Sequence, residues 1–254
     1  MAKRTVLVTG GAKRLGAAIV RRLAADGHRI VIHYGSSARE ADTLAQEVGA
    51  AGCVQGDLGD PASVEALFAS ARRLAGPIDR LVNSASTFAF DTPPVSDPAL
   101  MVRLYAVNCT TPALLTDALA RQDDVVDGAV VNLLDQKLAN LNPDFFGYTC
   151  AKAALAAATV MQAQALGPRM RVNAVAPGLT LPSADQTAEE FAMVASLNLL
   201  CRPVGADAVA DAVAYLIGSR GVTGQTVYVD CGQRFLARDR DVMFDRDKEA
   251  AALG

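Results

Sequence analysis

The sequence predicts an α/β fold, a doubly wound Rossmann fold with a parallel sheet of about seven strands and helices on both faces. Short apolar runs alternate with helical patterns along the whole chain. The first apolar run also leads through a glycine-rich turn into a helix, which is how such folds begin. With 254 residues, of which 51% are hydrophobic, we expect residues 1–254 to form a single domain around one core.

The first predicted unit is a strand at residues 5–8, the turn at 9–16 and a helix that continues to residue 25. Glycines let the backbone approach a pyrophosphate, and the N-terminus of the next helix offers free N–H groups and a positive dipole end. A glycine turn alone is weak evidence for nucleotide binding, but its place between strand and helix strengthens it. We expect cofactor contacts here at Gly10, Lys13, Arg14, Leu15 and Gly16.

The second predicted strand, residues 29–34, ends in a Gly-Ser-Ser sequence that contains Ser36 and Ser37. Enzymes that use NADH carry an acid here that holds the ribose 2′-hydroxyl and would repel a 2′-phosphate. Because this acid is missing and Lys13 and Arg14 are within reach, the sequence favours NADPH. The alternative is that these two basic side chains are solvated surface charges.

The elements that follow lead to the middle of the chain. We expect a helix at 38–50, a strand at 53–55, a helix that begins at Pro61, and a strand at 78–83. Asp57 and Leu58 follow the third strand, and Phe88 follows the fourth at the edge where open α/β sheets bind ligands. Phe88 could stack on a planar substrate or cover local core. The next helix, at 98–120, carries Asn108, whose amide could equally satisfy helix backbone groups.

The central part of the chain combines an Asp, a Tyr and a Lys. Tyr148 and Lys152 stand four residues apart in a strongly helix-forming stretch, so both project from one helix face. Asp135 follows an apolar run at 129–134 that predicts a buried strand, so its carboxyl lies at a strand tip. A phenol has a pKa of about 10, and a nearby ammonium group lowers it toward neutral pH. The alternative is that the Tyr and Lys are only a pair on a helix surface.

The last third of the chain completes the alternation. We expect a strand at 171–175, a helix at 207–217 and a strand at 225–229. Pro177 and Gly178 turn the first of these strands at the ligand edge. Residues 180–200 predict a mobile excursion over the site, and the charged tail at 238–254 is expected to be peripheral or to take part in assembly.

Composition argues against several classes of protein. The net charge is -3 and there is no basic block, so nucleic acid is not expected as a partner. Five widely spaced Cys and two His suggest neither a disulfide framework nor a metal site. Without a signal peptide or a membrane-spanning run, we expect a cytoplasmic protein that acts on a small molecule and makes no membrane contact.

Four motifs give the sequence a resemblance to the short-chain dehydrogenase/reductase family over residues 5 to about 235. They are the Thr-Gly-rich turn at 9–16, Asn83-Ser-Ala85, Tyr148 with Lys152, and Pro177-Gly178. Most members have Gly where this chain has Arg14, and Ser where it has Asp135. Both departures are similar to those of pteridine reductases and dihydromonapterin reductases. Further similarities are His33-Tyr34 with Ser37, and Ser86-Thr87-Phe88.

The resemblance implies reduction of a C=N bond, dihydropterin to tetrahydropterin, with hydride from NADPH. The pterin would lie between the nicotinamide and Phe88, and Asp135 and Tyr148 would supply the proton. Lys152 would bind the nicotinamide ribose and lower the pKa of Tyr148, while Asn108 would hold a water that relays protons to Lys152. Pteridine reductases commonly have an Arg near the Ser36 position, so here the phosphate contact must depend on other groups. Residues 180–200 show no recognisable pattern.

The resemblance also implies a full set of contacts. The cofactor contacts are Gly10, Lys13, Arg14, Leu15, Gly16, His33, Tyr34, Ser36, Ser37, Asp57, Leu58, Asn83, Ala85, Ser86, Lys152, Pro177 and Gly178. The substrate contacts are Ser86, Phe88, Asp135 and Tyr148. We expect a homo-oligomer, a tetramer by resemblance. Two alternatives stay open: a carbonyl or 3-oxoacyl reductase in which Asp135 replaces the orienting Ser, and an NADPH-binding regulator without turnover.

Overall fold

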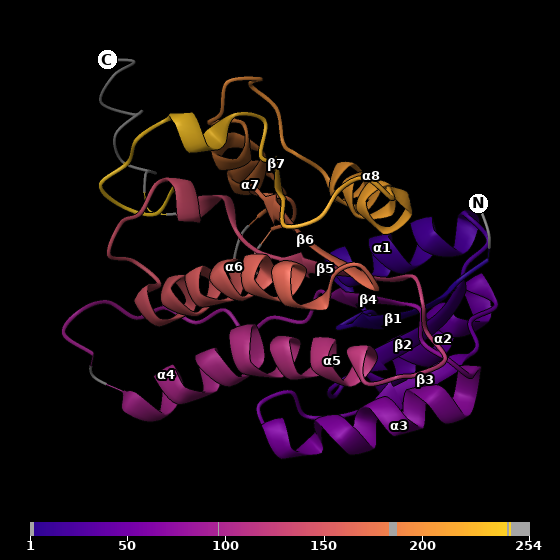
Figure 1. The fold of residues 1–254 in the computed structure, drawn as a ribbon. Coiled ribbons are helices and arrows are strands. Elements are labelled where there is room, and N and C mark those ends of the chain that lie inside the picture. Colours follow the sequence, from indigo (N-terminus) through magenta and orange to yellow (C-terminus); the bar gives the residue numbers. More distant parts are fainter. Residues whose placement is uncertain (1–2, 96, 183–186, 243, 245–254) are drawn as a thin grey trace, which may run out of the picture.

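A computed structural model of the chain describes residues 3–95, 97–182, 187–242 and 244. Its centre is a seven-stranded parallel sheet with the order β3-β2-β1-β4-β5-β6-β7, so the expected doubly wound fold is confirmed (Figure 1). The strands are β1 Thr5–Thr9, β2 Arg29–Tyr34, β3 Gly52–Gln55, β4 Arg80–Asn83, β5 Gly128–Leu133, β6 Met170–Pro177 and β7 Thr226–Val229. The strand order reverses between β1 and β4, which is where such sheets open a ligand crevice.

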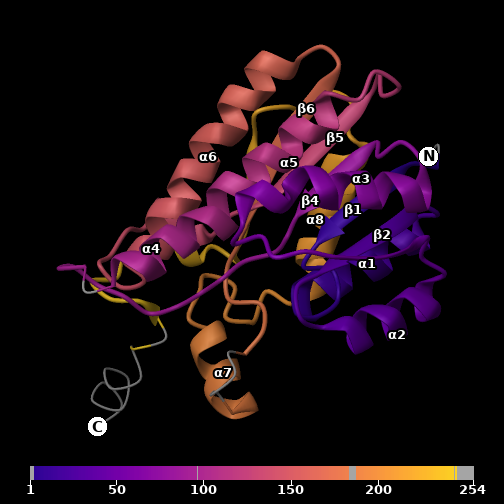
Figure 2. The ribbon, with the colours of Figure 1, turned by 90° about the horizontal axis from the view of Figure 1, so that it is seen from below.

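Helices cover both faces of the sheet (Figure 2). They are α1 Arg14–Ala25, α2 Ala38–Val48, α3 Val64–Ala75, α4 Pro98–Tyr105, α5 Thr111–Ala120, α6 Phe146–Leu166, α7 Ala188–Ala195 and α8 Ala206–Gly218. Shorter turns are the 3₁₀ segments η1 Pro61–Ser63, η3 Gln136–Ala139 and η4 Gln233–Phe235, and the π-helical η2 Ala106–Thr110. Side chains of α1, α2 and α8 pack on one face, and those of α3 and α5 on the other.

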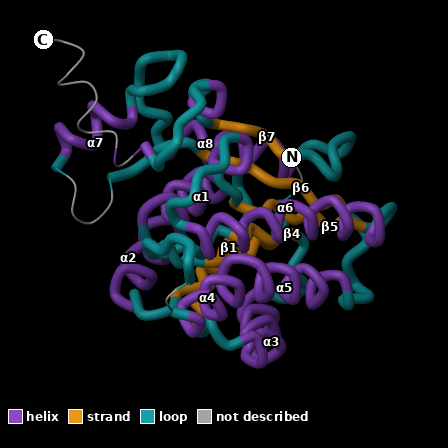
Figure 3. The backbone as a smooth tube through the Cα atoms, turned by 90° about the vertical axis from the view of Figure 1, so that its left-hand side faces the viewer, coloured by secondary structure: helices purple, strands orange, loops and turns teal. Residues whose placement is uncertain are grey.

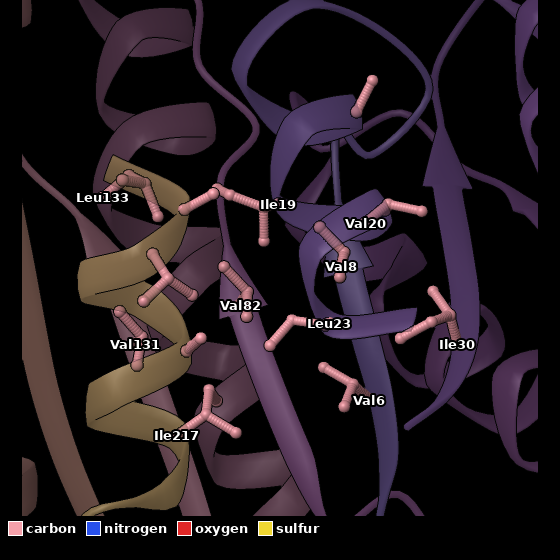
Figure 4. Close-up of a cluster of buried hydrophobic side chains, with 14 of the residues drawn as sticks. Val6, Val8, Ile19, Val20, Leu23, Ile30, Val82, Val131, Leu133 and Ile217 are labelled. Atoms are coloured by element: carbon pink, nitrogen blue, oxygen red, sulfur yellow. The ribbon is translucent and has the colours of Figure 1, made fainter. Parts of the chain in front are cut away.

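The two faces of the sheet take alternate residues of each strand. In β1, Val6 and Val8 point toward α1 and α8, while Leu7 points toward α3 and α5. Figure 4 shows the first of these clusters, where Ile19 of α1 and Ile217 of α8 meet Val82 of β4. Because helices cover both faces, the strands are continuous apolar runs rather than alternating ones. This rigid core holds the carboxyl ends of the strands in place.

Two segments differ from expectation. The helix expected at 98–120 contains the π-helical turn η2, which carries Asn108 and divides it into α4 and α5. The excursion expected at 180–200 contains the helix α7, which the sequence pattern did not indicate. Figures 2 and 3 both show α7 projecting away from the sheet. Residues 183–186 of this excursion lie outside the described residues.

The first residues of the charged C-terminal tail, which we expected to be peripheral or to take part in assembly, pack against the candidate site. Val242 is 5% exposed, and Arg240 and Asp241 bond to side chains next to the candidate site. The reason is that this segment covers two buried charged groups, Lys137 and Asp144, which need partners. Residues 243 and 245–254 lie outside the described residues.

Candidate active site

A cavity of about 620 Å³ opens at the carboxyl ends of β1, β2, β4, β5 and β6. Most of the residues expected from the sequence line it together. They are Gly10, Lys13, Arg14, Leu15, Gly16, His33, Ser36, Ser37, Asp57, Leu58, Ala85, Ser86, Phe88, Asp135, Tyr148, Lys152, Pro177 and Gly178. Residues far apart in sequence thus meet at one edge, because parallel strands all end there.

The glycine turn is held against the rest of the edge by a buried histidine. The Gly10 N–H donates to His33 Nδ1 at 3.1 Å, which places the ring proton on Nε2, 3.1 Å from the Gly56 carbonyl oxygen. Burial lowers the pKa of His33 to about 4, so the ring is neutral. Gly10 has φ +61°, and a Cβ there would lie 2.8 Å from the Ala85 Cα. His33 therefore shapes the turn, and only glycine fits beside it.

The two basic residues of the turn already have partners. Lys13 forms an ion pair with Glu40 at 2.7 Å, and the Arg14 guanidinium donates to the Pro182 carbonyl oxygen at 2.7 Å. The side chains of Lys13 and Glu40 are about half exposed (49% and 48%), and exposed ion pairs contribute little stability. A ligand phosphate can therefore replace Glu40 as the partner of the Lys13 ammonium group. Arg14 has φ +52°, which explains why glycine is common at this position in the family it resembles.

The expected catalytic groups form one hydrogen-bonded set. Asp135 caps η3: its Oδ1 accepts from the Lys137 N–H at 2.9 Å, and its Oδ2 accepts from the Tyr148 hydroxyl at 3.0 Å. Lys152, one turn further along α6, donates from Nζ to the Leu133 carbonyl oxygen at 2.7 Å. Tyr148 is 6% and Lys152 2% exposed. The Tyr and Lys are therefore not a surface pair.

The electrostatics of this set differ from expectation. Burial, followed by the nearby Asp135 carboxylate, raises the pKa of Tyr148 well above its ordinary value, so the expected lowering by Lys152 is wrong. The physical reason is that the hydroxyl faces a carboxyl oxygen while the ammonium group is directed to Leu133. Burial also raises the pKa of Asp135 and lowers that of Lys152 to about 8. The Asp135–Tyr148 pair therefore retains a transferable proton.

Asn108 connects η2 to the loop after β4. Its Nδ2 donates to the carbonyl oxygens of Thr87 at 2.9 Å and Leu104 at 3.0 Å, and its Oδ1 accepts from Ser86 Oγ at 2.7 Å. The bond to Leu104 is the helix-backbone role expected as the alternative. The other two hold the Ser86–Thr87 loop against the cavity. The role of a water bound at Asn108 stays a prediction.

Phe88 packs on neighbouring rings and also lines the cavity, while its stacking on a substrate stays a prediction. Its ring stacks on Phe145, with centroids 4.1 Å apart and planes at 21°, and meets the Tyr148 ring edge-on at 4.8 Å. It is nevertheless 48% exposed and lines the cavity. A planar ligand can therefore lie against an aromatic wall whose position is already set by neighbouring rings.

Two expected cofactor contacts lie outside the cavity lining. Asn83 is 1% exposed and donates to Asn132 Oδ1 at 2.8 Å and to the Pro112 carbonyl oxygen at 3.2 Å, so it joins β4 to β5. Tyr34 packs against the core cluster beside α1. Their place near the ends of strands was correct, but strand alternation directs these side chains into the protein.

The sequence analysis missed several residues that line the cavity or hold its wall in place. Arg103 pairs with Asp57 at 3.2 Å and lines the cavity from α4, where no sequence signal indicates it. Thr9 Oγ1 accepts from the N–H groups of Ser84 and Ala85 at 3.0 and 3.1 Å and so joins β1 to the loop after β4. The position of Thr9 at the end of the first strand could have indicated this role. Residues 179–181 complete the lining.

Among the residues that the structure describes, no group of three or more His, Cys, Asp and Glu side chains could hold a metal ion. Within the same residues, no helix has the length and hydropathy needed to cross a membrane. All five cysteines are free thiols.

Comparison with known proteins gives consistent matches. The FolM alternative dihydrofolate reductase 1 from Brucella canis, crystallised with NADP, is 41% identical with a TM-score of 0.88, covering 94% of this chain and 97% of that chain. A dihydromonapterin reductase from Citrobacter koseri is 28% identical, covering 90% of this chain and 95% of its own length. The 3-oxoacyl-[acyl-carrier-protein] reductase FabG from Staphylococcus aureus is also 28% identical, covering 90% and 97%.

A family model described as enoyl-(acyl carrier protein) reductase matches residues 10–234, which is most of the chain. The match includes the glycine turn, the Asp135–Tyr148–Lys152 set and the turn after β6. The chain therefore belongs to the short-chain dehydrogenase/reductase family.

Proposed function

We propose that this protein, an NADPH-dependent short-chain reductase, reduces the C=N bond of a dihydropterin. The observation that carries the proposal is the partly buried hydrogen bond of 3.0 Å between Asp135 and Tyr148 at the cavity wall. Hydride addition to a C=N bond leaves a ring nitrogen that needs a proton, and a carboxyl group with a raised pKa can donate one near neutral pH. The likeness to a dihydromonapterin reductase and to an alternative dihydrofolate reductase supports this substrate class.

The residues that line the cavity suit nicotinamide adenine dinucleotide phosphate. The N-terminus of α1 and the glycine turn form one end, where backbone N–H groups can face a pyrophosphate. After β2 the lining side chains are Ser36 and Ser37 rather than a carboxylate, and Lys13 and Arg14 lie at the same end. A 2′-phosphate would meet hydroxyls and positive charge there. When bound, the cofactor supplies the hydride.

Each side chain of the site then has a defined task. Phe88 offers a ring face against which a flat substrate can lie. Asp135 can donate a proton from its carboxyl group, and the Tyr148 hydroxyl, 3.0 Å away, donates a hydrogen bond to the carboxylate that remains after the transfer. Lys152 places a positive charge beside this pair, with its Nζ 5.7 Å from the centre of the Tyr148 ring. Tyr148 and Lys152 are buried at 6% and 2% exposure, whereas Asp135 is only partly buried and lines the cavity, where a substrate can reach it.

A carbonyl or 3-oxoacyl reductase is the second candidate. It is favoured by the likeness to FabG and by the description of the matching family model. In that case the Tyr148 hydroxyl would protonate a ketone oxygen, and Asp135 would only orient the substrate. The two candidates differ in what they require of Asp135, because a serine could orient a ketone but could not protonate a nitrogen.

The deciding experiment measures the loss of NADPH absorbance with dihydrobiopterin, dihydromonapterin and dihydrofolate, beside ketones and 3-oxoacyl thioesters. Asp135→Ser and Tyr148→Phe proteins serve as the matched variants. We expect pterin turnover in the wild type and its loss in Asp135→Ser. Turnover of ketones alone, undiminished in Asp135→Ser, would contradict the proposal and favour the second candidate.

We also propose that the protein assembles into a homotetramer. Several large apolar side chains on α4 and α6 are exposed in the single chain, at 71% for Val102, 43% for Val160 and 65% for Met161. Such side chains suit close packing against a second copy. Light scattering during gel filtration tests this, and a monomeric mass at micromolar concentration would contradict it.

A further inference from the structure

The C-terminal residues Arg238–Val242 lie against the η3 turn and the loop before α6, as Figures 1 and 2 both show. Lys137 of η3 is the central contact. Its Nζ donates to the Asp144 carbonyl oxygen at 2.6 Å and forms an ion pair with Asp241 Oδ2 at 3.0 Å. The side chain of Lys137 is only 5% exposed and that of Asp241 14%. The C-terminal segment therefore supplies the carboxylate that forms an ion pair with this buried ammonium group.

A second buried charge lies beside the first and is neutralised from the same segment. The Asp144 carboxylate, 4% exposed, accepts two parallel bonds of 3.1 Å from the Arg240 guanidinium and one of 2.8 Å from the Asp241 N–H. Burial by itself would raise the pKa of Asp144, but the hydrogen bonds from Arg240 and Asp241 outweigh burial and lower this pKa. The bidentate geometry fixes the direction of the segment as well as its distance.

This charged network reaches the active site through Lys137. While its side chain holds Asp241, its backbone N–H donates to Asp135 Oδ1 at 2.9 Å. The other oxygen of that carboxyl group accepts from the Tyr148 hydroxyl. One residue thus connects the C-terminal segment to the proposed proton donor. A shift of η3 would turn the carboxyl group away from the hydroxyl that it shares a proton with.

An aromatic contact makes a second, independent connection. The Phe244 ring lies parallel to Phe145, with centroids 6.1 Å apart and planes at 12°, and meets Phe90 edge-on at 5.4 Å. Phe145 in turn stacks on Phe88. The Arg240 guanidinium covers the Phe244 ring at 4.9 Å. The same segment therefore supports the wall against which a flat substrate would lie.

We propose that residues 238–242 and 244 form a C-terminal strap that positions Asp135 and the Phe88 wall for proton transfer, with Lys137 and Asp241 as positioning residues. The inference rests on the proposed role of Asp135 as proton donor. The strap touches neither the glycine turn nor the serines after β2 in the contacts described above, so it acts on the substrate end of the cavity. Its loss should reduce turnover and leave NADPH binding intact.

The strap also sets the charge around the proton donor. Asp135 faces Tyr148 and Lys152 from α6, the Lys137 N–H from η3, and Asp241 from the strap. The negative charge of Asp241 adds to burial in raising the pKa of Asp135. Removing that charge lowers this pKa, so the acid form is lost at a lower pH. The falling limb of the pH–rate profile should therefore move toward acid in an Asp241→Asn protein.

The test compares Asp241→Asn and Lys137→Met with Glu47→Gln, which removes an exposed ion pair to Arg21. Circular dichroism checks that each variant folds. If Lys137→Met does not fold, Asp241→Asn still tests the proposal, because Asn has nearly the same side-chain volume as Asp. We expect kcat with a dihydropterin to fall by about tenfold in Asp241→Asn, the size of one lost charged hydrogen bond. An Asp241→Glu protein, which keeps the negative charge, should retain a higher kcat than Asp241→Asn. NADPH affinity, measured by fluorescence titration, should stay at the wild-type value in all variants.

A substrate-free measurement separates this inference from the proposed function. Hydrogen exchange of the Lys137 amide reports its bond to Asp135. Faster exchange in Asp241→Asn than in Glu47→Gln supports the strap, even if the wild type reduces no pterin and the substrate assignment fails. Exchange, kcat and pH profile that all match the wild type in Asp241→Asn would overturn it.

Discussion

The replacement of Asp135 by Asn tests the proposed chemistry most directly. The carboxyl group accepts from the Tyr148 hydroxyl at 3.0 Å and from the Lys137 amide at 2.9 Å, and an Asn oxygen can keep the second bond. An Asn side chain cannot release a proton to a substrate nitrogen. A positioned general acid contributes about 10²–10⁴-fold, so we expect kcat with a dihydropterin to fall about 100-fold, or roughly 3 kcal/mol.

The assay follows the loss of NADPH absorbance at saturating dihydropterin, with NADPH affinity measured separately by fluorescence. Affinity should not change, because Asn has the size of Asp and the Lys152 contact to Leu133 is untouched. Turnover at the wild-type rate in Asp135→Asn would refute the argument. A fall in NADPH affinity that matched the fall in kcat would equally refute it, because the damage would then lie in the cofactor site.

The Asp135→Asn substitution should lower activity but raise the stability of the folded protein. Burial raises the pKa of Asp135, so the folded protein holds this proton more tightly than the unfolded chain. The carboxyl group therefore costs stability as the pH rises above the unfolded pKa of about 4. Asn does not ionise, so Asp135→Asn should have a higher Tm than the wild type at neutral pH and an equal one at low pH. A lower Tm at neutral pH would contradict this sign.

Three further predictions concern pH and the buried charges. Because burial lowers the pKa of Lys152 to about 8, the ammonium group is lost above that pH, and kcat should fall there in addition to the fall caused by deprotonation of Asp135. A Lys152→Arg protein, which keeps its charge, should lack the fall near pH 8 and keep the one that depends on Asp135. Burial lowers the pKa of His33 from 6.5 to about 4, so as the pH falls the unfolded chain takes up a proton before the folded protein does. The free energy of unfolding, measured in urea, should therefore decrease by about 3 kcal/mol between pH 6.5 and pH 4. A His33→Gln protein should not show this decrease. Asp127 neutralises Arg4 at 2.9 Å and the 5% exposed Arg80 at 3.3 Å at the sheet edge away from the cavity. Asp127→Asn should therefore lower the free energy of unfolding in urea by about 2–4 kcal/mol without changing NADPH affinity. An unchanged free energy of unfolding would show that Arg80 has sufficient partners elsewhere.

The predicted site residues that line the cavity share one property. Gly10, Gly16, Pro177 and Gly178 lie in turns at strand ends, and Asp135 follows a strand, so their place depends on local order along the chain. Once the strands are parallel, all these positions meet at one edge. Asn83 and Tyr34 lie at strand ends as well, but their side chains point away from the cavity. The sequence shows where a strand ends more readily than which way its last side chain points.

The charge state of the Tyr could not be obtained from spacing alone. The Tyr148–Lys152 interval predicts a shared helix face, and the structure agrees. Yet the pKa of Tyr148 is raised, because its hydroxyl meets Asp135, thirteen residues earlier in the chain, while Lys152 bonds to Leu133. Burial and partner geometry decide the sign of such a shift, and both are properties of the packed protein.

The sequence by itself determined the strand–helix alternation, the glycine turn and the place of the proposed catalytic groups at strand and helix ends, because each of these depends on neighbours within a few residues along the chain. Only the tertiary structure decided that the segment at 238–242 returns to Lys137 and Asp144, and that Phe244 reaches Phe145. These contacts join residues about a hundred positions apart. Nothing in the local pattern specifies them, since their partners are chosen by which buried charges and rings the folded core leaves uncovered.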